Sequence, residues 1–266
     1  MKLLTFYALL QITCFAGKSF AQVHTTYYDA GETILKEKFE TTEGVPNGSY
    51  MLYDPQGHLI QIGQYENGNL SGIFYDLHPI SQDTLKTTPY KNNQPHGSAR
   101  SYYPNGKVSQ IASYHEGRIE GEIISYFPSG KLKSKTLFEK GKPHGPHTTY
   151  FENGAIHEKQ SFRNGVLDGI QSGFNSTGQL THEKNYQNGS LQGLSITYFP
   201  DGIKATEINY QNGIKHGSFV SYHSNGQISL EGRYKRGLRN GKFIWKDVSG
   251  IITKEKTYKV GKEEIK

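Results

Sequence analysis

The chain has 266 residues, of which 34% are hydrophobic, and it is rich in Gly (31) and Tyr (19). So little aliphatic material excludes a thick hydrophobic core and favours a thin structure in which aromatic rings cover glycine-rich backbone. The formal net charge is +6, but residues 233–266 alone hold eleven Lys and Arg against four acidic residues. The basic balance therefore describes the C-terminal end and not the rest of the chain.

The first residues have the pattern of a targeting segment. An apolar stretch follows Lys2 and ends at Ala16, and the small residues Ser19 and Ala21 stand where a signal peptidase cleaves. We predict a signal peptide over residues 1–21. The apolar stretch is shorter than the roughly 20 residues that a spanning helix needs, which disfavours a transmembrane anchor.

Cys14 is the one cysteine of the chain. A lipoprotein anchored through Cys14 is a further alternative, but residues 11–13 match the usual small-residue box poorly. Removal of the leader leaves no cysteine, which excludes disulfides, thiol catalysis and cysteine metal sites. We expect an exported protein that is periplasmic, surface-bound or secreted.

Residues 22–266 are predicted to form one continuous array of about nine hairpins. The pattern is irregular over residues 27–89, regular over 90–258, and ends in a basic cap over 233–266. The irregular part includes an extra residue near 78–89. Places where the repeat fails are the candidates for function.

In the regular part an aromatic residue recurs every 24 positions, which predicts a repeat protein. This first ring series consists of Tyr90, Tyr114, Phe138, Phe162, Tyr186, Tyr210, Tyr234 and Tyr258. A second ring series lies twelve residues further along and consists of Tyr102, Tyr126, Tyr150, Phe174, Tyr198 and Tyr222.

Each unit of 24 residues has the pattern of one β-hairpin. Two runs rich in β-formers flank Pro104-Asn105-Gly106, which is strong turn chemistry. No sustained helical stripe follows residue 21. The predicted fold is all-β: an elongated, twisted, single-layer antiparallel sheet of stacked hairpins, open at both ends like a solenoid.

One glycine stands at the start of a strand in each unit. Glycine weakens a strand unless something needs its missing side chain, and a tyrosine or phenylalanine ring lying on bare backbone is the expected reason. These ladder glycines are Gly97, Gly121, Gly145, Gly169, Gly193, Gly217 and Gly241.

The run from Tyr186 through Asn188-Gly189, Gly193 and Tyr198-Phe199 to Gly202 resembles the MORN-repeat variant. The resemblance covers nearly all of residues 22–266. Several bacterial proteins of this kind are named as YwqK-type antitoxin components, and classical MORN arrays associate with protein partners and membrane phospholipids. The resemblance implies a bacterial repeat scaffold, with an antitoxin-like neutralising protein as a further alternative, and the targeting segment predicts an exported form of it.

No residue pattern points to catalysis, a cofactor or a metal ion. His96, His144 and His216 share one position of the repeat but lie at least two units apart, too far to share a metal. Glu183, Glu207, Glu231 and Glu255 recur once per unit, which predicts a solvated ladder or, alternatively, a repeated ligand contact. We expect a protein that is not an enzyme.

The aromatic residues leave two interpretations open. The second ring series forms either core against the ladder glycines, which a thin sheet favours, or a platform for glycans and extended peptides. The residues that follow it in sequence are expected to face the other way and to form an exposed binding surface. This adjacent column consists of Tyr103, Phe127, Phe151 and Phe199.

The basic end is the second candidate surface. Lys254, Lys256 and Lys259 could contact anionic lipid, acidic polysaccharide or an acidic protein, or could serve as a charged cap on the last strand. The leading hypothesis is an exported scaffold that binds another protein. The alternative is carbohydrate or anionic-lipid binding in the envelope, and expected export disfavours nucleic acid.

Overall fold

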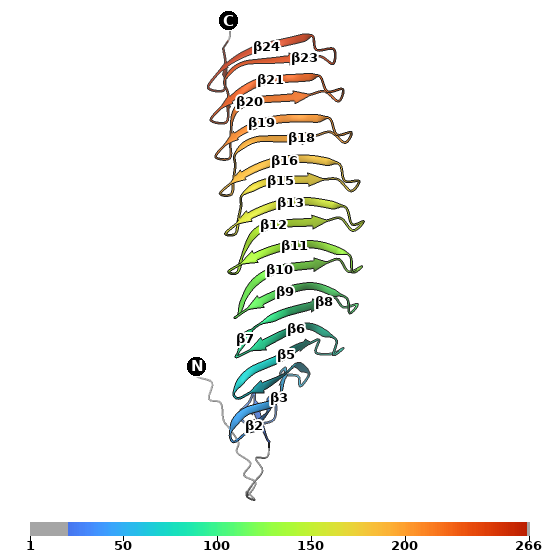
Figure 1. Cartoon of the computed structure of the whole chain (residues 1–266), viewed down its shortest axis with the longest axis vertical. Coiled ribbons are helices and arrows are strands. Elements are labelled where there is room, and N and C mark those ends of the chain that lie inside the picture. The colour runs from blue at the N-terminus through green and yellow to red at the C-terminus, as the bar shows by residue number, and fades with distance from the viewer. Residues whose placement is uncertain (1–20, 265–266) are drawn as a thin grey trace, which may run out of the picture. The chain divides into compact units, whose positions relative to one another are not determined.

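The computed structural model describes residues 21–264, and over this range it contains strands and turns but no helix. The chain divides after Lys131 into two compact units, which are described separately. In each unit the strands follow one another side by side in chain order (Figure 1). The predicted signal peptide falls on residues 1–21 and so lies, apart from its last residue, outside the described range.

Unit 1 holds ten strands of two to nine residues. They are β1 (Gln22–Tyr27), β2 (Leu35–Thr42), β3 (Val45–Tyr53), β4 (Leu59–Glu66), β5 (Asn69–Leu77), β6 (Thr84–Lys91), β7 (Gln94–Pro95), β8 (Gly97–Tyr102), β9 (Val108–His115) and β10 (Arg118–Tyr126).

Unit 2 continues the same arrangement. Its strands are β11 (Leu132–Glu139), β12 (Lys142–Tyr150), β13 (Ile156–Arg163), β14 (Val166–Leu167), β15 (Gly169–Phe174), β16 (Leu180–Gln187), β17 (Ser190–Leu191), β18 (Gly193–Tyr198), β19 (Lys204–Gln211), β20 (Ile214–Tyr222), β21 (Ile228–Lys235), β22 (Leu238–Arg239), β23 (Gly241–Lys246), β24 (Ile252–Lys259) and β25 (Lys262–Glu263).

Within each unit every long strand pairs antiparallel with the strands before and after it. In unit 2, β18 pairs with β19 and β19 with β20, with Gly193 opposite Tyr210 and Thr206 opposite Ser221. Each hairpin therefore hydrogen-bonds to the next one through neighbouring strands. The prediction of an all-β fold of stacked antiparallel hairpins is confirmed.

Two kinds of turn join the strands. One is the two-residue type I′ turn, as at Asn188 (φ 48°) and Gly189 (φ 79°), where both residues have positive φ. The Gly189 amide also donates to the Leu167 carbonyl of the preceding hairpin, 2.8 Å away. Because the same bond recurs along both units, these turns fasten each hairpin to its predecessor as well as closing a strand pair.

The turn at the opposite strand end is capped in two ways. Where it begins with Asp54, Asn175 or Asp247, that side chain accepts backbone N–H groups two and four residues further on. Where it begins with an aromatic residue or histidine, a later side chain takes over, and Asn105 accepts from the Lys107 amide and donates to the Pro128 carbonyl. The turn chemistry therefore tolerates an aromatic first residue.

The ladder glycines lie at irregularities in the strand register. Gly145, for example, has φ +86° and falls where the pairing of β11 with β12 skips between Thr136 and Phe138. A Cβ on Gly193 (φ +77°) would meet only the Asn185 side chain, at 3.9 Å. Positive φ therefore explains these glycines. The expectation that an overlying ring requires them is wrong.

At other glycines, which lie inside strands, a ring does pack on the bare backbone. Gly63, Gly173 and Gly232 lie inside strands without a positive φ, and the rings of Phe74, His182 and Phe243 respectively occupy the place of their absent Cβ atoms. At Gly232 a Cβ would lie 2.6 Å from carbon atoms of the Phe243 ring. Ring packing thus explains strand glycines that fall outside the ladder.

Candidate functional surfaces

The strand register separates two faces of each sheet. The ring face is the side that carries the first ring series, together with Phe74 in unit 1 and Phe243 in unit 2. The glutamate face of unit 2 is the opposite side, which carries Glu183, Glu207, Glu231 and Glu255. Because successive side chains of a strand alternate between faces, these two surfaces differ in composition throughout.

At the C-terminal end of unit 2 the ring face is a stack of aromatic side chains. Phe243 is fully buried. Its ring lies 5.7 Å from that of Tyr234 and 5.4 Å from that of Tyr258, both edge-to-face. Such pairs stabilise a sheet beyond the area that they bury.

The middle of unit 2 replaces these rings with polar side chains. The Glu158 carboxylate accepts hydrogen bonds from the side-chain amides of Gln160 and Gln171. His182 Nε2 lies 3.7 Å from Glu158 Oε1, and His147 Nδ1 lies 2.7 Å from the Thr136 hydroxyl. These residues, with Lys184, form a polar cluster on the ring face.

The polar cluster shifts the titration of its two histidines. Burial lowers the pKa of His147 below its ordinary value, and Glu158 opposes the shift. Burial also lowers the pKa of His182, with a further contribution from the Lys184 charge. The buried Nε2 of His182 and Oε1 of Gln171 have no hydrogen-bond partner in the described structure. The polar cluster thus contains two buried polar atoms that lack a hydrogen-bond partner.

The second ring series does not lie against the ladder glycines. Tyr198 donates from its hydroxyl to Glu183 Oε2 over 3.2 Å, and Tyr222 donates to Glu207 Oε2 over 2.9 Å, both on the glutamate face. Tyr102, Tyr126 and Tyr150 are half-buried like Tyr198 and Tyr222. Tyr198 and Tyr222 therefore cover the glutamate face of unit 2, where their hydroxyls bind two members of the glutamate ladder.

The adjacent column lies at the start of the turns. Tyr103, Phe127, Phe151 and Phe199 are all half-buried. Tyr103 donates from its hydroxyl to the Tyr126 carbonyl, 2.7 Å away in the next hairpin, and the Phe151 ring lies 4.5 Å from that of His157. These contacts show that the adjacent column helps to hold the turns and hairpins together. The remaining surface of its half-buried rings is exposed.

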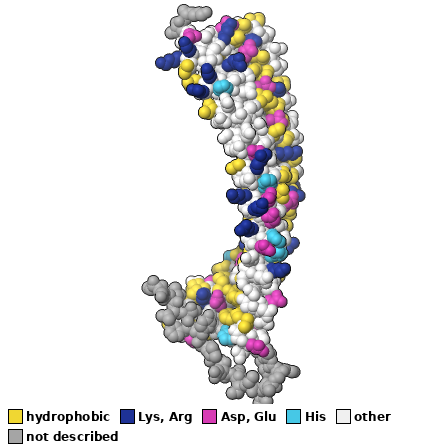
Figure 2. Space-filling model, turned by 60° about the vertical axis from the view of Figure 1, so that its left-hand side comes forward, with side chains coloured by type: hydrophobic (Ala, Val, Ile, Leu, Met, Phe, Trp, Pro, Cys, Tyr) yellow, Lys and Arg dark blue, Asp and Glu magenta, His cyan; other side chains and the backbone are white. Residues whose placement is uncertain are grey.

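The structure brings together only some of the residues predicted at the basic end. Lys254 and Lys256 lie on the ring face, whereas Lys259 adjoins the last turn, opposite Lys262. Lys256 forms an ion pair with Glu263. Figure 2 shows Lys and Arg side chains gathered near the C-terminal end.

Arg239 and Trp245 complete this basic cluster. The Arg239 guanidinium lies 4.9 Å from the ring centre of Phe243 and 5.2 Å from that of Tyr258, and the Lys254 ammonium lies 5.4 Å from that of Trp245. Cations held over rings stabilise the stack and remain attractive to anions. Sequence reasoning counted Arg239 within the basic end but did not single it out; the preceding repeat holds Lys215 at this position, and the Lys215 ammonium lies 5.3 Å from the ring centre of Tyr234.

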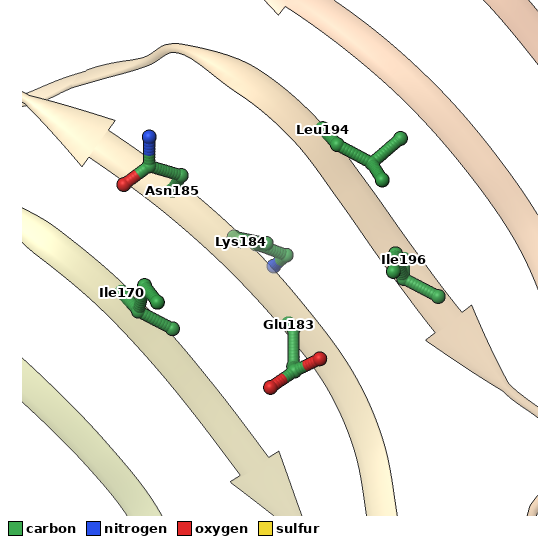
Figure 3. A pocket seen from close by; sticks show the side chains of 6 residues that line it. All are labelled: Ile170, Glu183, Lys184, Asn185, Leu194 and Ile196. Atoms are coloured by element: carbon green, nitrogen blue, oxygen red, sulfur yellow. The ribbon is translucent and has the colours of Figure 1, made fainter.

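The glutamate face carries a shallow hollow in the middle of unit 2. Its lining residues are Ile170, Glu183, Lys184, Asn185, Leu194 and Ile196. Ile170 and Leu194 are 61% and 44% exposed and stand on neighbouring hairpins, on either side of the strand that carries Glu183 and Asn185 (Figure 3). Sequence reasoning missed this hollow, because both aliphatic residues look like ordinary strand residues.

Two features are absent from the described residues. Among residues 21–264 there is no group of three or more His, Cys, Asp or Glu that could hold a metal ion. The described part of the chain also has no helix long and apolar enough to cross a membrane.

The stacked hairpins and their recurring turns define a repeat protein of the solenoid class. The chain belongs to the MORN repeat variant family, whose model matches more than half of it: residues 46–71, 95–116, 119–140, 143–164, 167–188, 191–212 and 215–236. Proteins of such repeats are generally scaffolds for interaction with proteins or membranes. No curated protein matches the chain.

Proposed function

We propose that this protein is an exported, non-enzymatic scaffold that binds another protein through its sheet faces, in the cell envelope or outside the cell. The observation that carries the proposal is the contrast between constant turns and variable faces. One exposed strand position holds a different kind of side chain in successive repeats: Ile73, Ser98, Glu122, Pro146, Ile170, Leu194, Ser218 and Lys242. A scaffold that varies its faces while keeping its turns presents a specific surface for a partner.

Two features support the absence of catalysis and the exported location. Neighbouring members of the glutamate ladder lie on separate hairpins, and Glu183 and Glu207 each bind a tyrosine hydroxyl, a structural use of the carboxylate. Export rests on the targeting pattern of residues 1–21. The antitoxin-like role has no such support from the residues.

Site-specific photo-crosslinking in the intact producing cell tests the proposal. A benzoylphenylalanine probe is placed at Ile170 or Leu194 on the glutamate face and, as a matched control, at Asn212 in an exposed turn. We expect one protein to crosslink from the face positions and not from the turn. No face-specific protein crosslink in the envelope or culture medium would contradict the proposal.

A second candidate function is supported by the basic cluster around Arg239 and Lys254. Cations beside Trp245 and Tyr258 suit anionic headgroups or acidic polysaccharide. Sedimentation with phosphatidylglycerol vesicles measures this directly. Salt-sensitive binding that Lys254→Glu abolishes, without any protein crosslink, would favour this function over the first.

A further inference from the structure

The hollow on the glutamate face combines apolar walls with polar ends. Ile170 lies directly opposite Asn185 in the sheet, and Ile196 lies directly opposite Glu183 on the other side. The Asn185 amide donates to the Gln192 carbonyl over 3.0 Å, which holds the side chain in place. Two exposed aliphatic side chains and one carboxylate therefore lie within the width of three strands (Figure 3).

Glu183 differs from the other members of its ladder in charge balance. Glu207 is bound by Lys204, Glu231 by Lys246 at 2.8 Å, and Glu255 by Lys242 at 2.8 Å. In the described structure Glu183 has a hydrogen bond from Tyr198 and no ion pair. Among the described residues the Glu183 carboxylate therefore has no ion-pair partner, and Lys184, which also lines the hollow, does not pair with it.

The same place in the next hairpin lacks these features. Ser218 and Val220 stand where Leu194 and Ile196 stand, and Glu207 replaces Glu183 with its lysine already bound. The combination of an open aliphatic wall and an unmatched carboxylate therefore marks the hairpin pair around Glu183.

We propose that this hollow binds an extended protein segment in which a lysine or arginine is flanked by aliphatic side chains. The cation pairs with Glu183, and the aliphatic side chains cover Ile170 and Leu194. This inference rests on the proposed protein-binding function and names the chemistry of the partner at one site. An anionic lipid is disfavoured by the Glu183 charge, and a glycan by walls that are aliphatic and not aromatic.

Methyl NMR on the full chain with short peptides tests this site without a known partner. The probe is the capped peptide Thr-Ile-Lys-Ile-Thr, with Thr-Ile-Glu-Ile-Thr and Thr-Ser-Lys-Ser-Thr as matched controls. We expect the first peptide to shift the methyl signals of Ile170, Leu194 and Ile196 saturably. We expect both controls to bind at least fivefold more weakly, because one loses the ion pair and the other the apolar contacts.

Matched variants locate the interaction. Glu183→Gln is expected to weaken binding of the lysine peptide at least fivefold, whereas Glu207→Gln changes it less than twofold. Leu194→Ser is expected to act like Glu183→Gln, and Ile73→Ser, at the same repeat position in unit 1, leaves it unchanged. Equal binding of the glutamate peptide, or equal effects of Glu183→Gln and Glu207→Gln, would overturn the proposal.

Two further outcomes separate this inference from the proposed function. If the crosslinked protein is captured equally by wild type and by Leu194→Ser, the scaffold function stands and the hollow is not its site. If sedimentation shows self-association that Leu194→Ser abolishes, the occupant is a second copy of the chain, which also overturns the inference. Peptide binding without any captured protein would support the hollow while the scaffold function fails.

Discussion

Lys246 takes over from a tyrosine in binding Glu231. In the two preceding hairpins the hydroxyls of Tyr198 and Tyr222 donate to Glu183 and Glu207, whereas the Lys246 ammonium lies 2.8 Å from Glu231 Oε1. The repeat keeps the contact between these two positions while it changes a hydrogen bond into an ion pair. Lys246 stands where the two preceding repeats have a tyrosine, and this departure from the repeat therefore has a structural explanation.

This exchange predicts that tyrosine can substitute for the lysine. Lys246→Tyr is expected to leave the stability of the last hairpins nearly unchanged, because a hydroxyl can again donate to Glu231. Lys246→Met removes a half-buried ion pair and should cost about 0.5–1 kcal/mol in urea denaturation. Lys242→Met, which breaks the more exposed pair with Glu255, serves as the control and should cost less. Equal losses for Tyr and Met at position 246 would contradict the expectation.

A second prediction concerns the fit between Gly232 and Phe243. Gly232→Ala puts a methyl group into the Phe243 ring and should destabilise the end of unit 2 by about 1–3 kcal/mol, and Phe243→Ala should cost about 3–5 kcal/mol. In unit 1 the equivalent pair is Ala112 and Ile123, which lie directly opposite each other. Alanine at the glycine position is therefore compatible with the sheet when the facing side chain is not a ring.

The double variant measures the coupling between these two residues. Gly232→Ala combined with Phe243→Ala should be no less stable than Phe243→Ala alone, because the methyl group then fills space that the ring has left. Hydrogen exchange of β21 and β23 amides reports the effect locally, which suits a repeat array in which hairpins can open separately. Additive losses in the double variant would show that the ring and the glycine are not coupled.

A third prediction is that acid weakens the middle of unit 2. Burial lowers the pKa of His147 and of His182 in the folded chain below the ordinary value of about 6.5. The folded state then binds fewer protons than the unfolded state, so this contribution to stability is fully present above about pH 6.5 and is lost as the pH falls. The urea midpoint should therefore decrease between pH 7.5 and pH 5.

Variants separate the histidines from other acid effects. Exchange of both residues, His147→Gln with His182→Gln, should reduce the fall in urea midpoint between the two pH values. His216→Gln, outside the polar cluster, is the control and should leave the fall as it is in wild type. The same pH dependence in the double variant and in wild type would rule out these two histidines as its source.

Much of the fold could be predicted from the sequence, because turns carry local information. Asn105-Gly106 and the ladder glycines mark strand ends and backbone irregularities that depend on φ alone, and the 24-residue period places them in every hairpin. The physical reason for the ladder could not be predicted in the same way. A glycine under a ring and a glycine with positive φ look alike in sequence, and only the direction of the absent Cβ separates Gly232 from Gly193.

The candidate surfaces were harder to predict, because they depend on which side of the strand a residue faces. Tyr198 stands two residues after Ile196, which lies opposite Glu207, so strand alternation places the second ring series of unit 2 on the glutamate face; this depends on the pairing across strands, which a repeat pattern does not reveal. The missing ion partner of Glu183 likewise depends on which lysine reaches which carboxylate across strands. The composition of each candidate surface therefore depends on which side chains meet across strands, and local sequence patterns do not predict this pairing.

The last prediction tests the ladder glycines through backbone strain alone. Gly193 has φ +77°, and a Cβ there would make only an ordinary contact with Asn185, so space does not limit a substitution. Gly193→Ala should cost about 1–2 kcal/mol, because an L-residue resists the left-handed region. Gly193→Asn should cost less, since asparagine tolerates that region better. Urea denaturation with hydrogen exchange at β18 measures both variants, and a larger loss for Asn than for Ala would show that side-chain volume, not φ, selects glycine.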